Sequence, residues 1–183
     1  MLSRFFAFFL LILFLPIFLL VSLVIFIEDG FPVFFTQKRV GINYTFFNIC
    51  KFRSMKKNTP DVATHLLENP DQYLLKIGKF IRKTSLDELP NLINIVKGEM
   101  VFVGPRPALY NQDDLMQFRV ATGVSKLKPG ITGWAQINGR DEISLEEKVR
   151  FEKEYLIRKS FWFDLKILVL TFTSVLKSDG VKH

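Results

Sequence analysis

The stretch from Phe5 to Ile27, which carries no charged side chain, constrains this chain of 183 residues more than any other feature. It exceeds the roughly 20 apolar residues that a helix needs to cross the hydrocarbon core of a bilayer. A secretory signal has a shorter apolar core, about 7 to 15 residues, and ends at small residues of the A-x-A type. The stretch meets neither condition, so we expect a membrane segment that stays in the mature protein.

Pro16 lies near the middle of this apolar stretch. Proline removes a backbone donor and clashes with the preceding turn, so we expect the helix to kink or break there. A bent helix could cross the bilayer. The chain could instead dip in and return to the same face, which keeps Arg4 and the basic remainder on the cytoplasmic side. The residues alone leave both geometries open and slightly favour the crossing helix.

The remainder of the chain is basic and holds few metal-binding or redox residues. The net charge is +7, and residues 28–183 account for +6 of it. A basic surface suits an anionic leaflet, a phosphate-bearing ligand or nucleic acid, but no nucleic-acid motif is found, so nucleic acid is not an expected partner. Cys50 has no disulfide partner, and His65 and His183 lack the cysteine neighbours of a zinc site. These residues indicate a reducing, cytosolic environment without structural zinc.

The first half of the basic remainder predicts a hairpin followed by two helices. Aromatic and β-branched residues flank a turn at residues 41–43, which is typical of a short β-hairpin. Residues 56–69 are polar and loop-like. An Asn-Pro-Asp sequence then predicts a helix over residues 71–83, and a second helix is expected to begin near Asp87.

The second half alternates loops and helices. Residues 100–110 and 128–140 contain several glycines and prolines, and loops of this kind usually position functional groups. A charged helix is expected over residues 144–158. Residues 161–177 begin with three aromatic residues and carry flanking lysines, so we expect an interfacial helix, with a buried core helix as the alternative. No internal repeat is found, so no second folded domain is expected.

Two acids, Asp87 and Glu88, stand side by side just ahead of Pro90 in the sequence TSLDELP. Proline is tolerated only in the first turn of a helix, so a helix should begin near this pair. The structural explanation is capping, because Ser85 and Glu88 have capping-box spacing, or Asp87 is itself the cap. The functional explanation uses the same helix end, which attracts phosphate and lowers the pKa of a carboxylate.

The acid pair suits phosphoryl transfer better than glycoside hydrolysis. Adjacent residues on a helix point about 100° apart, so two neighbouring acids cannot easily flank one bond as in a typical glycosidase. One carboxylate can instead attack phosphorus while the other holds Mg²⁺, whose shell is completed by phosphate and water. Such a site needs cations for the charge on the phosphoryl group, and the candidates are Arg82, Arg106 and Arg140.

Several longer motifs resemble the bacterial sugar transferases, the monotopic phosphoglycosyl transferases that include the small enzyme of N-glycan assembly. The motifs are FTQKRVG, FNICKFRSM, RKTSLDELPNLINIVKGEMVFVGPRP, KPGITGWAQINGR and SFWFDLKILVLTFTSVLKSDG, in the family's order and approximate spacing. The resemblance covers nearly the whole chain. Long motifs in a fixed order are far more specific than a lone acid pair.

The resemblance implies a reaction, its partners and the residues that carry it. It implies transfer of a sugar 1-phosphate from a UDP-sugar to undecaprenyl phosphate, a polyprenyl phosphate, with release of UMP, as the first membrane step of bacterial glycan assembly. Asp87 matches the family's nucleophile, which forms a phosphosugar-aspartate intermediate in a ping-pong mechanism, and Glu88 matches the glutamate associated with Mg²⁺. The cations expected to contact phosphate or nucleotide are Arg82, Arg106, Arg140 and, as weaker candidates, Lys51 and Arg53.

The resemblance also implies an α+β fold: a mainly helical monotopic membrane protein with a re-entrant N-terminal helix-break-helix, a short β-hairpin and interfacial amphipathic helices. Residues 1–28 are expected to form the re-entrant helix in the lipid bilayer, broken at Pro16. Residues 29–183 are expected to form a catalytic domain at the cytoplasmic face of the bacterial inner (plasma) membrane. This geometry replaces the crossing helix that the residues alone favour. A helix packed in the membrane plane also makes a homodimer plausible.

Three positions depart from the family pattern, and the sugar is undetermined. Leu15 precedes Pro16 where the family often has serine, which leaves a carbonyl freed by the proline less well satisfied inside lipid. Glu152 replaces the usual aspartate and Arg158 the usual asparagine of small relatives, which bears on sugar choice or loop packing. The alternative function is a catalytically silent module that binds lipid phosphate through the same fold, and the intact acid pair argues against it.

Overall fold

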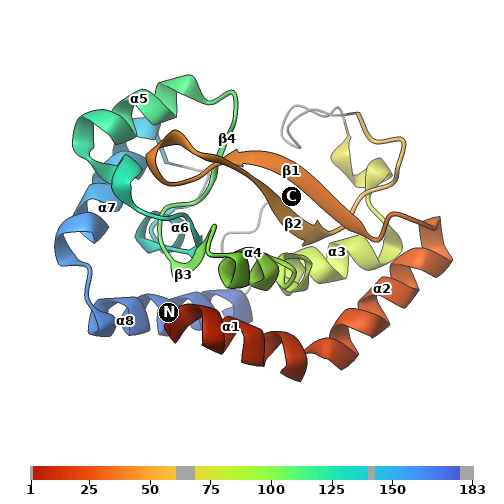
Figure 1. Ribbon diagram of the computed structural model, residues 1–183. Coiled ribbons are helices and arrows are strands. Elements are labelled where there is room, and N and C mark those ends of the chain that lie inside the picture. The colour runs from red at the N-terminus through yellow and green to blue at the C-terminus, as the bar shows by residue number, and fades with distance from the viewer. Residues whose placement is uncertain (1, 61–68, 140–142, 178–183) are drawn as a thin grey trace.

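The computed structural model describes residues 2–60, 69–139 and 143–177 (Figure 1). Helices form most of the described elements, and two small sheets, one of three strands and one of two, lie among them. The predicted mixture of a mainly helical chain with a short hairpin is therefore confirmed. Placement in a membrane is a separate question, which depends on the surface that the helices expose.

The apolar stretch forms two helices that meet at a bend. α1 spans Leu2–Leu13 and α2 spans Leu15–Asp29, and the bend between them is 60°. Pro16 lies in the first turn of α2, where its missing N–H has no helical partner to lose, so the predicted break is confirmed. Within the described ranges no single helix has the length and composition to span a membrane, whereas this bent pair taken together does.

The predicted hairpin is present and gains a third strand. β1 (Phe34–Val40) and β2 (Phe46–Phe52) pair antiparallel around a turn at Ile42–Tyr44. The short strand β4 (Ala108–Leu109) pairs with the other edge of β1. The irregular segment predicted after Met100 is therefore partly a strand, and it adds to a hairpin that lies far away in the sequence.

A second, parallel pair joins the two loop segments that were expected to position function. β3 (Val101–Val103) pairs with β5 (Gly130–Thr132), and neither strand was predicted. A strand of three residues has too little alternation to be recognised from sequence. Only glycine fits at the first position of β5, because a Cβ at Gly130 would lie 2.2 Å from the backbone nitrogen of Gly104.

The helix expected over residues 71–83 is interrupted, which corrects the prediction of one continuous helix. A 3₁₀ turn covers Pro70–Tyr73, two extended residues follow, and α3 runs from Lys76 to Lys83. The helix breaks because the Leu75 N–H donates to a carbonyl oxygen just after β2 (3.0 Å) instead of one within a helix. The Glu28 carboxylate at the end of α2 then accepts hydrogen bonds from the first two N–H groups of α3.

The helix after the acid pair begins later than predicted. A 3₁₀ turn, η4, covers Leu86–Glu88, and α4 runs from Asn91 to Lys97 with Pro90 as its N-cap. Ser85 is left-handed (φ 56°), and neither helix start is capped by a side-chain hydrogen bond. The capping explanation for the acid pair is therefore wrong.

The last two predicted helices are present with nearly the predicted bounds. α7 spans Leu145–Arg158 and is capped by Ser144, whose Oγ accepts a backbone hydrogen bond (3.2 Å). α8 spans Phe161–Lys177. Two shorter helices, α5 (Asp113–Thr122) and α6 (Trp134–Ile137), were not predicted, and both pack against α7.

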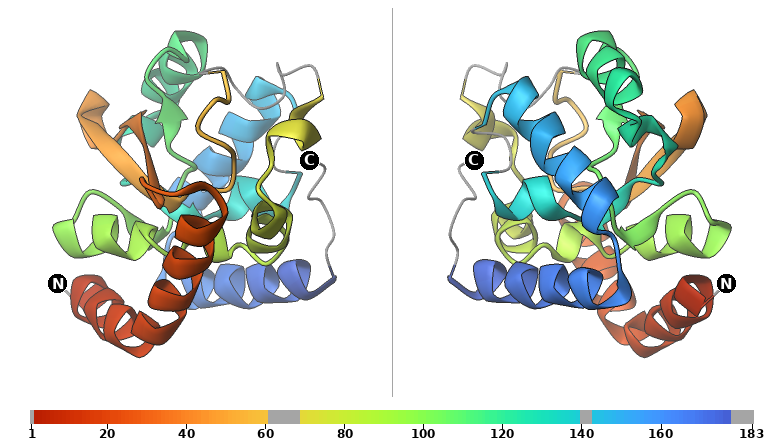
Figure 2. Two further views of the ribbon diagram at one scale, coloured as in Figure 1. Left: turned by 90° about the vertical axis from the view of Figure 1, so that its right-hand side faces the viewer. Right: turned by 90° about the vertical axis from the view of Figure 1, so that its left-hand side faces the viewer.

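The helices of the apolar stretch pack on the rest of the molecule. α1 lies along α4, and Ala7 is fully buried in a cluster that includes Leu92 and Ile95. α2 contributes Phe18 and Ile25 to a second cluster beneath β2 and α3. In Figure 2, α1 and α8 lie at the same end of the molecule, below the hairpin and α4. The turn that carries the acid pair is thus close to this end.

Candidate active site

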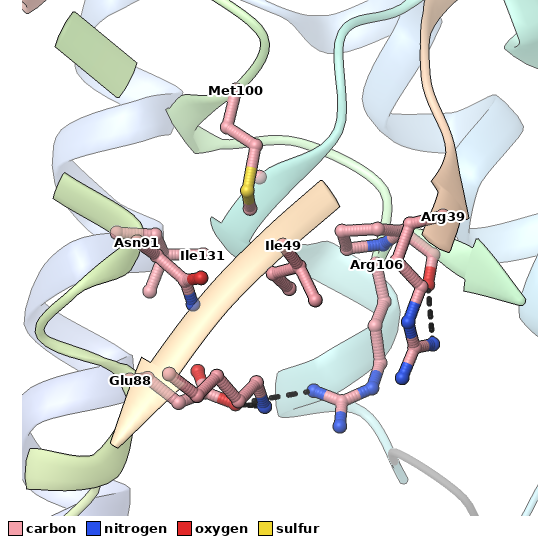
Figure 3. A pocket seen from close by; sticks show the side chains of 10 residues that line it. Arg39, Ile49, Glu88, Asn91, Met100, Arg106 and Ile131 are labelled. Carbon is pink, nitrogen blue, oxygen red and sulfur yellow. Dashed lines mark hydrogen bonds and ion pairs between the residues drawn. The ribbon is translucent and has the colours of Figure 1, made fainter. Parts of the chain in front are cut away.

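The acid pair lies in the turn before α4, and its surroundings come from distant parts of the chain. Lys51 is on β2, whereas Arg106 lies between β3 and β4. Figure 3 shows Arg106 and Glu88 pointing toward each other across the mouth of a pocket. The pocket is lined by polar and apolar side chains that include Arg39, Ile49, Lys51, Glu88, Asn91 and Arg106.

Two cations hold the carboxylate of Glu88. Its Oε1 lies 2.7 Å from Lys51 Nζ and 3.7 Å from an Nη1 of Arg106, and its side chain is only 14% exposed. Charge-assisted hydrogen bonds are stronger than neutral ones, and partial burial reduces their screening by salt. Glu88 therefore has a fixed orientation, and the two cations are held close to the neighbouring acid.

Asp87 is in an unfavourable environment for a charged carboxylate. Burial, and then the charge of Glu88, raises the pKa of Asp87 to about 6, although Lys51, Arg82 and Arg106 oppose this shift. The carboxylate is still largely ionised at neutral pH. An ionised group that is costly to bury, placed beside fixed cations, is typical of a functional site.

Replacing Asp87 by asparagine is expected to stabilise the metal-free protein at alkaline pH. The folded pKa of about 6 lies above the ordinary value of 3.8, so the ionised group destabilises the fold above pH 6, and this cost disappears as the pH falls below 3.8. One pKa unit corresponds to about 1.4 kcal/mol, so the free energy of unfolding should rise by about 2 to 3 kcal/mol near pH 8. Unfolding midpoints of both proteins, recorded in a chelator across this pH range, measure the gain.

The matched control is Asp113→Asn, because Asp113 is an exposed acid in the first turn of α5. There the substitution removes a favourable charge near a helix N-terminus, so it should slightly lower stability at alkaline pH. An Asp87→Asn protein that was no more stable than the unchanged chain at high pH would contradict the environment described for Asp87.

Arg82 is the predicted cation that approaches Asp87 from α3. Its Nε donates to Ser54 Oγ (2.8 Å), which fixes the guanidinium between α3 and the end of β2. Burial lowers the pKa of Arg82, and the charge of Asp87 opposes that shift. Arginine remains protonated in such an environment, so Arg82 is a third fixed positive charge near the nucleophile candidate.

Arg53 is buried and bound to the end of α2. Its guanidinium pairs with the Asp29 carboxylate and donates to the carbonyl oxygens of Asp29 (3.2 Å) and Gly30 (2.7 Å). These contacts join the apolar helices to the strand that carries Lys51. A phosphate contact by Arg53 stays a prediction, which this geometry does not support. Arg140, the remaining cation expected at the site, lies outside the described residues.

Three functional candidates were not singled out for binding or catalysis from the sequence. Arg39 lines the pocket and donates from Nη1 to the Pro107 carbonyl oxygen (3.0 Å). The hairpin register places Arg39 on the same face as Lys51, so a register argument could have found it. Arg119 and Glu152 form a buried ion pair, which no local pattern indicates because α5 and α7 meet only in the fold.

Glu88, the expected magnesium ligand, fits a site of the kind that substrate completes. Within the described ranges no three histidine, cysteine or acidic side chains come together to hold a metal by themselves. Mg²⁺ commonly takes one or two carboxylates and obtains its other ligands from water and substrate phosphate. The carboxylate of Glu88 meets that requirement, and the raised pKa of the neighbouring Asp87 marks a place where added positive charge is favourable.

Comparison with known proteins agrees with this chemistry. The model of the bacterial sugar transferase family matches residues 1–178. An uncharacterized sugar transferase of Bacillus subtilis is 46% identical over 158 residues, which cover 86% of this chain and 76% of that protein. The UDP-glucose:undecaprenyl-phosphate glucose-1-phosphate transferase of Escherichia coli is 42% identical over 169 residues, which cover 88% of this chain and 36% of that protein.

A further relative carries a different sugar in its name. The undecaprenyl-phosphate galactose phosphotransferase of Salmonella typhimurium is 36% identical over 173 residues, which cover 84% of this chain and 35% of that protein. This chain thus spans about a third of the length of the Escherichia and Salmonella proteins.

Proposed function

Because this chain belongs to the bacterial sugar transferase family, we propose that it transfers a sugar 1-phosphate from a UDP-sugar to a polyprenyl phosphate such as undecaprenyl phosphate. The names of two relatives describe transfer of glucose 1-phosphate and of galactose involving undecaprenyl phosphate. The observation that carries the proposal is the acid pair. Glu88 is paired with Lys51 and Arg106, and its neighbour Asp87 is a buried carboxylate whose pKa is raised by burial and by the charge of Glu88.

Asp87 supplies the nucleophile in the proposed first step. One carboxylate oxygen forms a bond to the phosphorus that carries the sugar, the bond from that phosphorus to the bridging oxygen breaks, and UMP leaves with the electron pair. In the second step an oxygen of the polyprenyl phosphate attacks the same phosphorus, and the bond to Asp87 breaks, which restores the carboxylate. A covalent intermediate of this kind gives ping-pong kinetics.

Lys51 and Arg106 supply fixed positive charge at the reacting phosphates. Both are oriented by Glu88 before any substrate binds, so little reorganisation is needed as charge develops on the phosphoryl group. Glu88 would hold Mg²⁺, which when bound would neutralise phosphate oxygens and stabilise the leaving UMP. Charged residues of the chain and the metal therefore act on the same phosphates.

We also propose that α1, α2 and α8 rest in the cytoplasmic leaflet of the bacterial inner membrane. α1 and α8 lie along one end of the molecule (Figures 1 and 2). Apolar surface of this extent is unusual on a protein that does not bind a membrane or a partner. The exposed side chains include Phe5, Phe9, Leu19, Leu23, Phe161, Trp162, Val169 and Phe172.

Both ends of the apolar helix pair are tied to the same folded body, which supports a re-entrant geometry. At the beginning, an Nη2 of Arg4 donates to the Lys97 carbonyl oxygen (3.1 Å) at the end of α4. At the other end, Glu28 accepts backbone hydrogen bonds from α3, and Asp29 pairs with Arg53. A helix that crossed the bilayer would place its first residues on the far side, where the contact with α4 could not form.

A cysteine at position 3 is therefore expected to react only from the cytoplasmic side. The test uses Ser3→Cys in a Cys50→Ser background, so that the chain has a single thiol. A membrane-impermeant maleimide should label inverted membrane vesicles and leave intact spheroplasts unlabelled. Asp113→Cys, at an exposed position of α5, serves as the cytoplasmic reference. Labelling of position 3 in intact spheroplasts would establish a crossing helix instead.

The direct test of the reaction mixes the protein with Mg²⁺, polyprenyl phosphate and a panel of UDP-sugars, and measures UMP. At least one donor should release UMP in proportion to the lipid product. A silent module of the same fold would bind the polyprenyl phosphate yet release no UMP with any donor, and that result would reject the proposed function. The panel also identifies the sugar.

A further inference from the structure

The backbone that carries Arg106 is fixed by three hydrogen bonds from three different elements. The Pro105 carbonyl oxygen accepts from the Gly130 N–H of β5 (2.9 Å). The Arg106 carbonyl oxygen accepts from an Nη2 of Arg119 on α5 (2.9 Å), and the Pro107 carbonyl oxygen accepts from Nη1 of Arg39 on β1 (3.0 Å). Every carbonyl of the Pro-Arg-Pro segment is therefore held, and the two prolines restrict the remaining backbone freedom.

The Arg119 contribution depends on an ion pair with Glu152. The side chains of Arg119 and Glu152 are only 6% and 2% exposed, and Arg119 Nε donates to Glu152 Oε2 (2.8 Å) while a second bond joins its Nη2 to Oε1. The fork of the guanidinium thus binds the carboxylate on α7 and the Arg106 carbonyl at once. Burying two charges is costly, so such pairs often add little net stability relative to well-packed apolar residues. Positioning of the Arg106 backbone is a function that would account for burying this pair next to the Pro-Arg-Pro segment.

We propose that the Arg119–Glu152 pair is a positioning device that sets where the Arg106 guanidinium meets the reacting phosphate. Of Arg106, Arg119 and Glu152, only Arg106 faces the acid pair. Its Nη1 lies 3.7 Å from Glu88 Oε1. Arg119 and Glu152 act through it and do not touch the phosphates themselves. This inference rests on the proposed function, because it assigns Arg106 to the phosphates of that reaction.

The test is a double-mutant cycle between Arg119→Lys and Arg106→Gln. Lysine keeps the positive charge that Glu152 requires but lacks the fork that reaches the Arg106 carbonyl as well. A small misplacement of a charge-stabilising group can lower turnover roughly 100-fold, so Arg119→Lys alone should reduce kcat by about 10- to 100-fold, with a smaller change in KM for the UDP-sugar. In the Arg106→Gln background the same substitution should change kcat by less than about 3-fold, because the group it positions is absent.

Matched controls separate positioning from general destabilisation. Glu147→Gln breaks the exposed pair between Glu147 and Arg150 on the same helix as Glu152, and it should leave kcat unchanged in both backgrounds. Glu152→Asp keeps the charge and should retain more activity than Glu152→Gln at a temperature where all variants are folded. Equal losses for these two Glu152 variants would indicate packing damage and not loss of the ion pair.

Backbone exchange provides a readout that does not require turnover. A peptide covering residues 102–108 reports the amides of Gly104, Arg106 and Ala108 only, because its first two residues lose their label and proline has no amide hydrogen. Hydrogen exchange in this peptide should be faster in Arg119→Lys than in the unchanged chain and unaffected in Glu147→Gln.

The outcomes distinguish this inference from the proposed function. If the unchanged chain releases no UMP with any donor, the proposed function fails, and unaltered exchange in Arg119→Lys would then overturn the positioning device as well. If the unchanged chain is active but Arg119→Lys lowers kcat equally in both backgrounds, or in neither, the inference alone is overturned. Non-additive kcat losses together with faster exchange support it.

Discussion

Asp87→Asn is expected to reduce UMP release by about 10⁴-fold or more, because the amide cannot form the bond to phosphorus on which both steps depend. Asparagine has nearly the same shape and removes only the charge and nucleophilicity. The variant should also fold at least as well as the unchanged chain, since ionised Asp87 is buried at a cost that raises its pKa to about 6. An inactive protein that is more stable at alkaline pH cannot be explained by unfolding.

The covalent intermediate gives this prediction a second measurement. With a donor labelled in the sugar phosphate and no lipid acceptor, the unchanged chain should retain label on a peptide containing residues 84–90, and Asp87→Asn should retain none. Asp113→Asn should label normally, because that exposed acid is remote from the acid pair in the sequence. Label recovered on another residue, or normal turnover by Asp87→Asn, would contradict the assignment of the nucleophile.

Features that depend on a few neighbouring residues were predictable from the sequence. Pro16 determined the break between α1 and α2, and Ser144 determined the start of α7. The hairpin followed from a turn at residues 41–43 between two runs that contain aromatic and β-branched residues. In each case one or two side chains act on the backbone within one helical turn or one hairpin, so no knowledge of the rest of the fold was needed.

The local structure predicted for the acid pair was wrong, whereas the functional assignment of Asp87 and Glu88 stays a prediction. The spacing of Ser85 and Glu88 indicated a capping box, yet Ser85 is left-handed and Glu88 turns to Lys51 and Arg106. Both partners come from other elements and are brought close only when the hairpin and the β3–β5 pair form. The Ser85 N–H, which a capping box would present to Glu88, donates instead to the Arg82 carbonyl oxygen (3.1 Å), and Glu88 accepts a charge-assisted hydrogen bond from Lys51.

Long-range contacts also decide which cations belong to the site. Lys51 lies near the end of β2 and Arg53 directly follows that strand, so the sequence offered no reason to expect different partners for the two cations. The structure directs Lys51 to Glu88 and Arg53 to Asp29. The buried pair of Arg119 and Glu152 was likewise inaccessible to sequence reasoning, since it exists only where α5 packs on α7.

Glu88→Gln is expected to reduce turnover by about 10²- to 10³-fold, because it removes both the anion that orients Lys51 and Arg106 and one proposed magnesium ligand. Glutamine keeps the length of the side chain and can still accept a hydrogen bond from Lys51. The variant should therefore remain folded, and the loss should fall mainly on kcat. Glu146→Gln, at an exposed position in the first turn of α7, is the matched control and should retain full activity.

Glu88→Gln should lower turnover and yet increase the ionised fraction of Asp87, and this combination makes the prediction specific. The charge of Glu88 raises the pKa of Asp87, so its removal should lower that pKa below about 6 in the metal-free protein, as measured by carbon NMR of the labelled Asp87 carboxyl. A larger fraction of Asp87 would then be ionised at every pH near 6 while turnover is reduced. Reduced turnover with a more fully ionised nucleophile would place the function of Glu88 in holding cations. An unchanged turnover would show that Glu88 is not needed to hold the cations for the reaction. A higher pKa for Asp87 would show that the charge of Glu88 does not raise that pKa.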